Sequence, residues 1–449
     1  MNTDNRFENL RLLIEKKQFK ELSAELQKLN EVDIAQFLSA LDAEKAVYVF
    51  RTLNKETAAD VFANLDNDMQ KAVIHSITDQ ELAWIMNDLA VDDAVDMVSE
   101  MPANVVKRVL KNARPDTRAL INKFLNYPDN SAGSIMTAEF TDLRADMTVR
   151  EAFEHLRETG EDRETIYTCY VIDAMRKLTG VVTVKTLLLS SYETKISDIM
   201  CTDVISISTM EDQEEAARLL AKYDFLALPV VDMENCLVGI ITVDDAIDVI
   251  REETTEDFQK IAATYPSEKP YLKTSVVTLA KNRIVWLLVL MISDMISGNI
   301  LGNYEAAFTT MPLLVTFIPM LTDTGGNAGS QSSTLVIRGL AVHEITTHDF
   351  LTIFWKEFRV AILCGGVLSL FNYIRLVIQY PGQEMVALTV ALAMFCTVLM
   401  AKVIGGVLPL IATRFKMDPA LMASPLITTI VDAVSLLIYL HIAVVLLPI

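Results

Sequence analysis

An acidic side chain inside a long apolar segment is the feature of this sequence that most needs a chemical explanation. Asp432 lies within the apolar stretch 418–447, several turns from either end. A carboxylate at that depth in a membrane costs about 2.5–3.5 kcal/mol on insertion scales, so it should face a cavity or a partner. Pro425 removes one backbone hydrogen bond and frees a carbonyl oxygen one turn earlier. Nearby hydroxyls come from Ser424, Thr428 and Thr429.

These groups supply carboxylate, hydroxyl and carbonyl oxygens, which are the hard ligands that suit Mg²⁺. Because Mg²⁺ keeps most of its waters, two copies of Asp432 across a dimer axis could hold one hydrated ion. The structural alternative is a pair between Asp432 and Lys402, His441 or an asparagine of a neighbouring span. Asp294 is a second intramembrane carboxylate, and it has no such company of oxygens.

A polar, glycine-rich run, PMLTDTGGNAGSQSST, occupies positions 319–334 of another apolar segment. Its small residues would let a second helix approach closely. Asn327 and Gln331 are one turn apart and offer amide oxygens on one face, which makes them candidate pore-lining residues. The alternative is a tight helix–helix seam without ion contact, and both can hold because a pore needs close packing around it.

A third signal is the acidic segment 244–257, DDAIDVIREETTED, which is predicted to be a helix running towards the membrane. Asp245, Asp248, Glu252 and Glu256 share one face of it. Like charges at this spacing cost about 0.2–0.5 kcal/mol per pair in an isolated helix, so the surface calls for cations or basic residues.

Four other acids could form a wall opposite this helix: Glu214, Asp224, Asp92 and Asp93. Divalent cations would then cross-link domains when abundant and leave when scarce, which makes a feedback switch through differential affinity. The alternative is a solvated acidic face.

The elements that must position these residues fall into four regions. Residues 1–130 form an acidic region of short helices, separated by Asn, Asp or Pro. Residues 131–250 contain an internal repeat, in which the strand, Asp and glycine pattern from Tyr170 to Val184 returns from Pro229 to Val243. An α/β module is predicted there. An acidic connecting (plug) helix follows at 245–275, and the region 276–449 is an all-α membrane domain.

Five transmembrane helices are predicted, at 284–302, 308–338, 358–379, 385–412 and 418–447. Lys and Arg cluster before the first span, between the second and third, and between the fourth and fifth. This bias predicts a multi-pass protein with its N-terminus in the cytoplasm and its C-terminus outside.

Composition divides in the same way. The net charge of −20 resides mostly in the first 275 residues, whereas 51% of the chain is hydrophobic. The acidic balance argues against nucleic acid as a partner and favours cations, with plain solubility as the alternative. The first 25 residues are charged throughout and contain no signal peptide, so we expect the acidic half in the cytoplasm.

The repeat resembles a tandem cystathionine-β-synthase (CBS) domain pair, a regulatory module that often senses an adenine nucleotide or a metal ion. The order of the regions, with the runs Pro319–Gln331 and Pro425–Asp432, resembles the MgtE magnesium transporter family over essentially the whole chain. The resemblance implies a superhelical N-terminal domain, and a homodimeric Mg²⁺ channel of the plasma (inner) membrane with Asp432 at the pore. It implies closure by Mg²⁺ bound to Glu214, Asp224, Asp245, Asp248, Glu253, Glu256 and Asp257, with Asp92 or Asp93, and ATP as a candidate ligand of the CBS pair.

The chain departs from this family at two positions. Ser424 precedes Pro425 where the family has asparagine, which leaves the selectivity among Mg²⁺, Ca²⁺, Mn²⁺ and Co²⁺ open. Asp294 lies outside the family pattern.

Three rival functions are weaker. A broader Co²⁺ or Mn²⁺ transporter with the same gating lacks the His or Cys cluster that softer metals prefer. A CBS-regulated membrane enzyme lacks HExxH, a Ser–His pair or GxSxG in the spans, so we expect no enzyme. An anion channel would not place an aspartate in mid-membrane.

Overall fold

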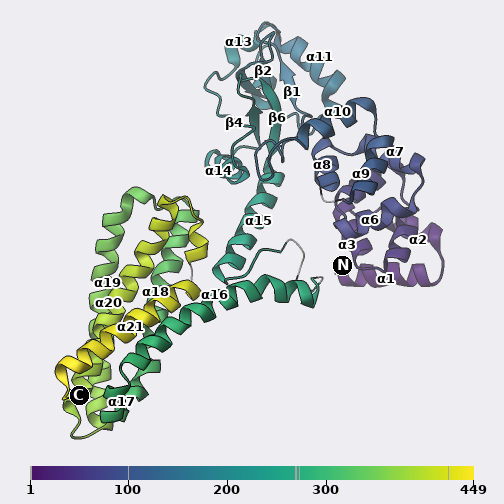
Figure 1. Cartoon of the computed structure of the whole chain (residues 1–449). Coiled ribbons are helices and arrows are strands. Elements are labelled where there is room, and N and C mark those ends of the chain that lie inside the picture. The colour runs from purple at the N-terminus through teal and green to yellow at the C-terminus, as the bar shows by residue number, and fades with distance from the viewer. Residues whose placement is uncertain (1–2, 100, 268–270, 273, 423, 449) are drawn as a thin grey trace. The chain divides into compact units, whose positions relative to one another are not determined.

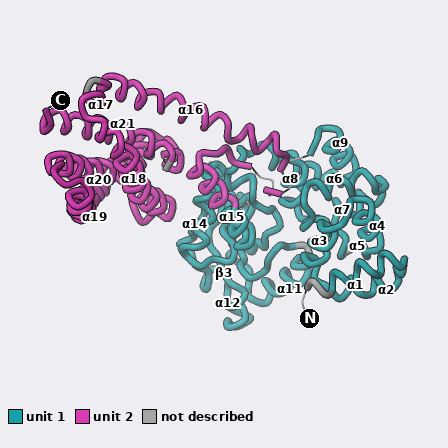
Figure 2. Tube along the Cα trace, turned by 90° about the horizontal axis from the view of Figure 1, so that it is seen from below, with its two compact units in different colours: residues 1–251 teal, residues 252–449 magenta. Residues whose placement is uncertain are grey.

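The computed structural model describes residues 3–99, 101–267, 271–272, 274–422 and 424–448. The chain forms two compact units, residues 1–251 and residues 252–449 (Figure 2).

The first unit begins with an array of short helices, as predicted (Figure 1). They are α1 (Thr3–Glu15), α2 (Phe19–Leu26), α3 (Glu31–Ser39), α4 (Ala43–Phe50), α5 (Lys55–Ala63), α6 (Asn67–Ser76), α7 (Asp79–Asp88), α8 (Val91–Ser99), α9 (Ala103–Asn112) and α10 (Pro115–Phe124). Asn30, Asn54 and Asp66 each accept a hydrogen bond from the first turn of the helix that follows. These side chains start the helices because they satisfy otherwise unpaired N–H groups.

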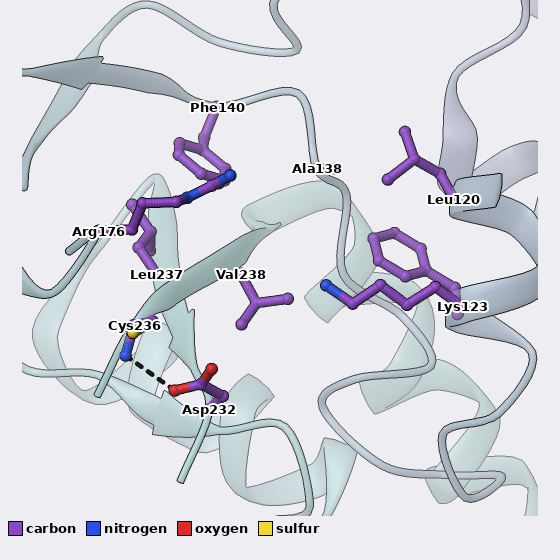
Figure 3. Close-up of a pocket in the computed structure, with 10 residues that line it drawn as sticks. Leu120, Lys123, Ala138, Phe140, Arg176, Asp232, Cys236, Leu237 and Val238 are labelled. Carbon is purple, nitrogen blue, oxygen red and sulfur yellow. Dashed lines mark hydrogen bonds between the residues drawn. The ribbon is translucent and has the colours of Figure 1, made fainter. Parts of the chain in front are cut away.

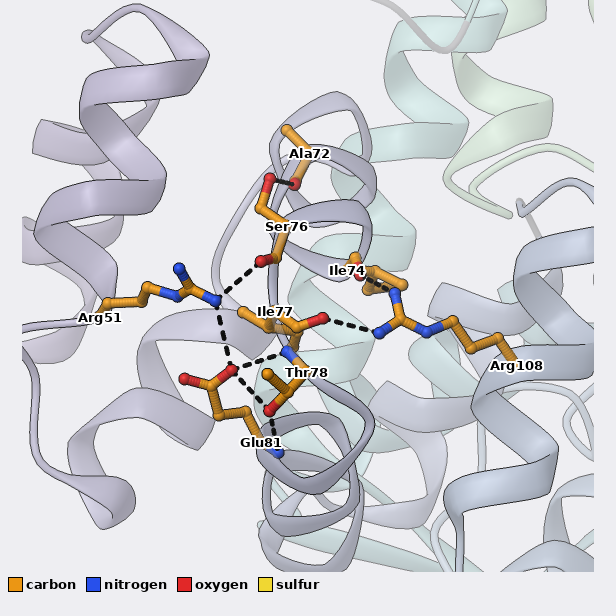
Figure 4. Close-up of polar contacts among 8 residues, drawn as sticks. All are labelled: Arg51, Ala72, Ile74, Ser76, Ile77, Thr78, Glu81 and Arg108. Carbon is orange, nitrogen blue, oxygen red and sulfur yellow. Dashed lines mark hydrogen bonds and ion pairs between the residues drawn. The ribbon is translucent and has the colours of Figure 1, made fainter.

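Two arginines hold the turn between α6 and α7 (Figure 4). Arg108 donates to the carbonyl oxygens of Ile74 and Ile77, the second at 2.6 Å, and pairs with Asp79 at 2.8 Å. On the other side, Arg51 donates to the carbonyl oxygen of Ser76 at 2.8 Å. The two guanidinium groups thus satisfy carbonyls that the end of α6 leaves without a helical partner.

The repeat forms two three-stranded sheets of the same topology. The first contains β1 (Thr141–Leu143), β2 (Thr168–Ile172) and β3 (Leu178–Thr183), and the second contains β4 (Ile207–Ser208), β5 (Ala227–Val231) and β6 (Leu237–Thr242). In each sheet the first pair is parallel and the second antiparallel. The associated helices are α11 (Val149–Thr159), η1 (Gly160–Asp162), α12 (Val184–Leu189), α13 (Ile196–Ile199) and α14 (Gln213–Tyr223).

The repeated aspartates are turn residues. Asp173 Oδ1 accepts from the N–H groups of Met175 and Lys177, and Asp232 Oδ1 accepts in the same way two and four residues later. Their role is therefore to shape the two hairpin turns, and the repeat that the sequence predicted is confirmed.

Helix α15 (Val243–Ile261) is shorter than the expected acidic segment 245–275. The helix ends where Ala263 adopts a positive φ of 50°, shortly before Pro266. A left-handed residue and a proline both stop a helix, since the first redirects the backbone and the second lacks an N–H.

The second unit is a bundle of long helices. It contains α16 (Val276–Asn303), α17 (Glu305–Thr310), η2 (Pro312–Phe317), α18 (Ile318–Ala341), η3 (Thr347–Asp349), α19 (Phe350–Gln379), α20 (Glu384–Arg414), η4 (Pro419–Met422) and α21 (Ser424–Leu446). Among the described residues, four stretches are long and apolar enough to cross a membrane: Val276–Asn303, Thr347–Gln379, Glu384–Arg414 and Pro419–Leu446.

Helix α18 is not among these four stretches, so the count of five spans is not confirmed. The expected second span, 308–338, also differs from the structure, because its long helix begins only at Ile318. The glycine-rich run lowers the hydropathy of α18, and its buried face consists largely of small residues. Helix α18 packs against α20 and α21.

Candidate ion pathway and acidic clusters

The seam between α18 and its neighbours leaves no room for a side chain at its glycine positions. A methyl group on Gly405 would overlap the carbonyl group of Gly329, and one on Gly325 would lie 2.7 Å from Thr397 Cγ2. Close backbone approach of this kind is what small residues permit in helix packing. The tight seam expected from the glycines is therefore present.

An exposed polar row lies on another face of α18. Asp323, Asn327 and Gln331 follow at intervals of four residues and are all exposed. Asn327 Nδ2 donates to Asp323 Oδ2 at 3.2 Å. Polar side chains on a helix of an apolar bundle face water or protein, since hydrocarbon does not solvate them. The row that contains both predicted pore-lining amides thus requires a covering other than lipid.

Asp432 lies on α21 with its carboxylate turned into the bundle. The residue is half-buried, and its Oδ1 atom is enclosed without a hydrogen-bond partner. The charged groups that act on it are Asp294 of α16 and Asp323 of α18, which both repel it. Within the part of the chain that the structure describes, no ion pair involves Asp432.

Lys402 does not neutralise Asp432, so that alternative is not realised. Its Nζ atom lies 3.5 Å from Ser332 Oγ, which in turn donates to Glu357 Oε2 at 2.6 Å. The buried lysine is thus linked through the Ser332 hydroxyl to Glu357 on α19.

The predicted hydroxyls divide between two faces of α21. Thr428 packs against Gly326 of α18, where a methyl group would lie 2.9 Å from its Cγ2 atom. Thr429 is buried and donates to the carbonyl oxygen of Pro425 at 3.0 Å, so its hydroxyl is already satisfied within the helix. Ser424 begins α21, and its side chain lies outside the described residues. Thr428 shares the face of Asp432, one turn away.

A second group of acids gathers in the first unit. Asp92 and Asp93 at the start of α8 lie close enough to Asp245 to be repelled by it. Loss of surrounding water, with repulsion from Asp93 and Asp245, raises the pKa of Asp92 to about 8. Loss of surrounding water and repulsion from Asp245 likewise raise the pKa of Asp93 to about 6. A nearby cation would stabilise the ionised form of these carboxylates and offset the repulsion between them.

Glu139 and Glu164 join this group, and the sequence reasoning missed them. Burial and the charge of Glu164 raise the pKa of Glu139 to about 7. Burial also raises the pKa of Glu164, with Asp245 and Asp244 adding repulsion. No spacing rule links them to α8 or α15, because the tertiary fold alone brings these segments together.

The other predicted sensing acids of the first unit lie on α15 and at the two ends of α14. Asp245 Oδ2 accepts from Thr242 Oγ1 at 2.5 Å, so it also stabilises the start of α15. Asp248 is exposed one turn later. Glu214 lies in the first turn of α14, whereas Asp224 ends that helix in a left-handed conformation with φ of 53°. Ten residues of helix separate these two by about 15 Å, so they belong to different sites.

The second half of α15 carries its own cation. Lys260 Nζ lies 2.5 Å from Glu256 and 2.7 Å from Asp418, which precedes α21. Burial raises the pKa of Asp257, and repulsion from Asp418 adds to this. Glu253 lies one turn before Asp257 on the same helix. The sequence did not identify Lys260 or Asp418. It did predict that a basic residue or a cation would neutralise the acidic face of this helix.

No group of three or more His, Cys, Asp or Glu side chains in the described residues is arranged to hold a metal ion. The acids are therefore near enough to repel one another without forming a ligand shell. The assignment of Mg²⁺ to them stays a prediction.

The first unit also contains a cavity of about 270 Å³ (Figure 3). Lys123 of α10 and Arg176 bring positive charge to its wall, and Phe140 adds a ring. Asp232 lies on the opposite side, where it is held by the N–H of Cys236 at 2.9 Å.

Comparisons with known proteins agree with this organisation. Residues 318–442 match the family described as "Divalent cation transporter" (MgtE), residues 29–130 match the MgtE intracellular N domain, and residues 132–193 and 196–252 each match a CBS domain. The Magnesium transporter MgtE of Thermus thermophilus is 34% identical over 93% of this chain and 93% of its own length. The chain belongs to the MgtE family.

Other MgtE proteins show the same extent of similarity. The Magnesium transporter MgtE of Bacillus subtilis is 32% identical over 96% of this chain and 95% of its own. The crystal structure of the cytosolic domain of the Mg²⁺ channel MgtE in complex with ATP is 35% identical, with a TM-score of 0.51, and covers 54% of this chain and 98% of that one. Membership in MgtE makes this a membrane transporter whose N-terminal helices and CBS pair precede the apolar helices.

Proposed function

We propose that the chain is a Mg²⁺ channel of the plasma membrane that admits Mg²⁺ past Asp432. The observation that carries the proposal is the set of oxygens on α18 and α21, where Asp432 and Thr428 are near the exposed row of Asp323, Asn327 and Gln331. Carboxylates and amide oxygens without a basic partner suit a hydrated divalent cation. Related proteins named as magnesium transporters support the choice of ion.

The exposed row also supports a homodimer. A second copy placed against α18 would cover Asn327 and Gln331 and enclose a polar path between the two protomers. The lysines and arginines of the sequence favour five spans, with the N-terminus cytoplasmic and the C-terminus outside. Helix α18 would then be the additional span, the second in chain order, screened from lipid by its neighbours and by the second copy.

Closure by internal Mg²⁺ is the second part of the proposal. When Mg²⁺ is abundant, it would neutralise the acids around Asp92 and Asp245, and those of α15, and hold the cytoplasmic regions in one arrangement. When it is scarce, repulsion among these acids would separate them and open the pore. The CBS pair is proposed to bind ATP, as the cytosolic domain of the solved Mg²⁺ channel does. The cavity of Figure 3 suits ATP poorly, because it is small and Asp232 would repel phosphates.

Flux into proteoliposomes that contain the full chain tests the transport step. Asp432→Asn keeps the size of the side chain and removes its charge, so Mg²⁺ influx should fall at least about tenfold. Glu384→Gln, an exposed change at the start of α20, serves as the control and should transport normally. Normal influx in Asp432→Asn would remove this carboxylate from the pathway. Competition with Co²⁺ and Mn²⁺ distinguishes a Mg²⁺ channel from the broader divalent-cation transporter.

The gating step has its own test. A triple variant with Asp245→Asn, Asp248→Asn and Glu256→Gln retains polar side chains and should stay open at millimolar internal Mg²⁺. If it closes at the same internal concentration as the unchanged chain, the acids are only a solvated surface.

A further inference from the structure

A buried lysine in the membrane unit has no part in the pathway described so far. Lys402 of α20 is 6% exposed, and a lysine is almost never buried to this extent unless it is paired. Its Nζ atom lies 3.5 Å from Ser332 Oγ of α18, and that hydroxyl donates to Glu357 Oε2 of α19 at 2.6 Å. Charged side chains inside an apolar bundle are costly, so their presence points to a functional role.

Each member of this group belongs to a different helix. The Ser332 hydroxyl bridges the ammonium group of Lys402 and the carboxylate of Glu357, which form no direct ion pair within the described residues. Glu357 crosses α20 where that helix has no side chain, because a methyl group on Gly406 would lie 2.7 Å from its Cγ atom. Two charges and one hydroxyl, which we call the Lys402–Ser332–Glu357 bridge, thus connect α18, α19 and α20.

The next residue connects the same turn of α18 to the short helix η4 that precedes α21. Ser333 is fully buried, and its Oγ atom donates to the carbonyl oxygen of Met422 at 3.0 Å. Two successive residues of α18 are therefore tied to neighbouring elements, directly after Gln331 of the exposed row. Because a helix moves as a rigid element, a shift at Ser332 would displace Gln331 and Asn327 as well.

We propose that Lys402 and Glu357 are positioning residues of the ion pathway, which act through Ser332 to hold α18 in one register. In that register Asn327 and Gln331 present their amide oxygens to the path. This inference rests on the proposed function, since it concerns the helix that supplies these amides. Groups that bind an ion need support from residues behind them, because a small displacement of the ligands weakens binding.

The two charges make the role testable. Removing one charge of a buried pair leaves the other uncompensated, whereas removing both together can be nearly neutral. A single substitution at Lys402 or Glu357 should therefore disturb α18 more than the double substitution does. Such recovery requires that the two residues act on one another.

Mg²⁺ influx into proteoliposomes with the full chain is recorded against external Mg²⁺ for Lys402→Met, Glu357→Gln and the double variant. Methionine keeps the unbranched apolar stem, and glutamine keeps an acceptor for the Ser332 hydroxyl. Each single variant should raise the half-saturating Mg²⁺ concentration at least about threefold, because displaced amides bind the ion less well. The double variant should return to within about twofold of the unchanged chain. A smaller amount of folded protein lowers only the maximal influx, so the half-saturating concentration reports position rather than stability.

Exposed residues of the same helices provide matched controls. Lys356→Met on α19 and Glu384→Gln at the start of α20 remove the same kinds of charge from exposed positions. Both variants should leave the half-saturating Mg²⁺ concentration unchanged.

The outcomes separate the two proposals. If Asp432→Asn is inactive and both single variants keep the half-saturating concentration of the unchanged chain, the positioning role is overturned and the pathway stands. If Asp432→Asn transports normally, the pathway fails and the positioning role with it. A double variant as impaired as the single variants would overturn the bridge, since the two charges would then act independently. Where a single variant does not reconstitute as a monodisperse protein, Ser332→Ala removes the hydroxyl and keeps both charges. It should raise the same concentration, and an unchanged value would overturn the proposal.

Discussion

Lys260 and Asp418 form an ion pair of 2.7 Å between α15 and the short turn that precedes α21. The same ammonium group lies 2.5 Å from Glu256. Burial lowers the pKa of Lys260, but its hydrogen bonds to Asp418 and Glu256 outweigh this and raise the pKa above its usual range. Lys260 therefore stays charged and neutralises the two carboxylates that it contacts.

Removing this built-in cation should make the acids of α15 available to Mg²⁺. In Lys260→Met, Glu256 and Asp418 lose their partner, while the apolar stem keeps its length. We expect closure of the channel at a lower internal Mg²⁺ concentration, by about two- to tenfold, because each added cation relieves more repulsion. The measurement is influx against internal Mg²⁺. Lys45→Met, which removes an exposed surface pair with Asp42, is the control. An unchanged closing concentration would mean that Lys260 does not compete with Mg²⁺.

Asp92 should make the first unit sensitive to pH in the absence of Mg²⁺. In the folded protein its proton is held up to about pH 8, whereas an unperturbed aspartate releases it near 3.8. The folded state therefore binds more protons than the unfolded state between these values, and the stability contributed by the protonated carboxyl is lost as pH rises through 8. Hydrogen exchange of α8 in the full chain should show less protection at pH 9 than at pH 6, after correction for intrinsic rates.

Two comparisons identify the cause of this pH effect. Asp92→Asn should flatten the pH dependence, and Asp116→Asn, an exposed change on α10, should not. Added Mg²⁺ should restore protection at pH 9, because the cation replaces the proton as the neutralising charge. If protection in Mg²⁺-free protein is the same at both pH values, Asp92 does not carry the shift.

The sequence predicted those features that depend on local pattern. The duplicated hairpin with Asp173 and Asp232 recurs at a fixed spacing, and Asp432 is conspicuous because its neighbours are apolar. Features that depend on tertiary contact were missed. Glu164 joins Asp92 across a long stretch of chain, and Lys260 meets Asp418 in the same way. Neither contact has a spacing signature, because only the packing of whole elements brings these side chains together.

The predicted count of five spans depends on α18, which is not among the four apolar stretches of the described residues. The sequence predicted a span over α18, and the helix is long enough for one. Its glycines, serines and exposed amides lower its hydropathy, so it is not among the four apolar stretches of the described residues. A helix packed against α20 and α21 does not need an apolar surface all round, since protein covers part of it. The polar residues of α18 that the proposed pathway uses are also residues that lower its hydropathy.

Arg108 should be required for the stability of the N-terminal helices. Arg108→Lys retains the charge but cannot donate to the carbonyl oxygens of Ile74 and Ile77 and to Asp79 at once, because an ammonium lacks the planar fork. The loss should be about 1.5–3 kcal/mol of local stability, seen as faster hydrogen exchange in α6 and α7. Arg157→Lys, an exposed change on α11, should leave exchange there unchanged. Equal protection in the two variants would contradict a clamping role.

Gly405 should tolerate no side chain. In Gly405→Ala the new methyl group would overlap the backbone of Gly329, so α18 and α20 must separate. Overpacking of this kind costs about 1–3 kcal/mol, and it also displaces the row of α18 that contains Asn327. We expect a lower melting temperature in detergent together with reduced Mg²⁺ influx. Gly366→Ala is the matched control, because nothing lies within 4 Å of its added methyl group. Since both substitutions place the same residue in an apolar helix, a loss confined to position 405 assigns the effect to the seam, whereas equal behaviour of the two variants would show that α18 and α20 are not held at this contact.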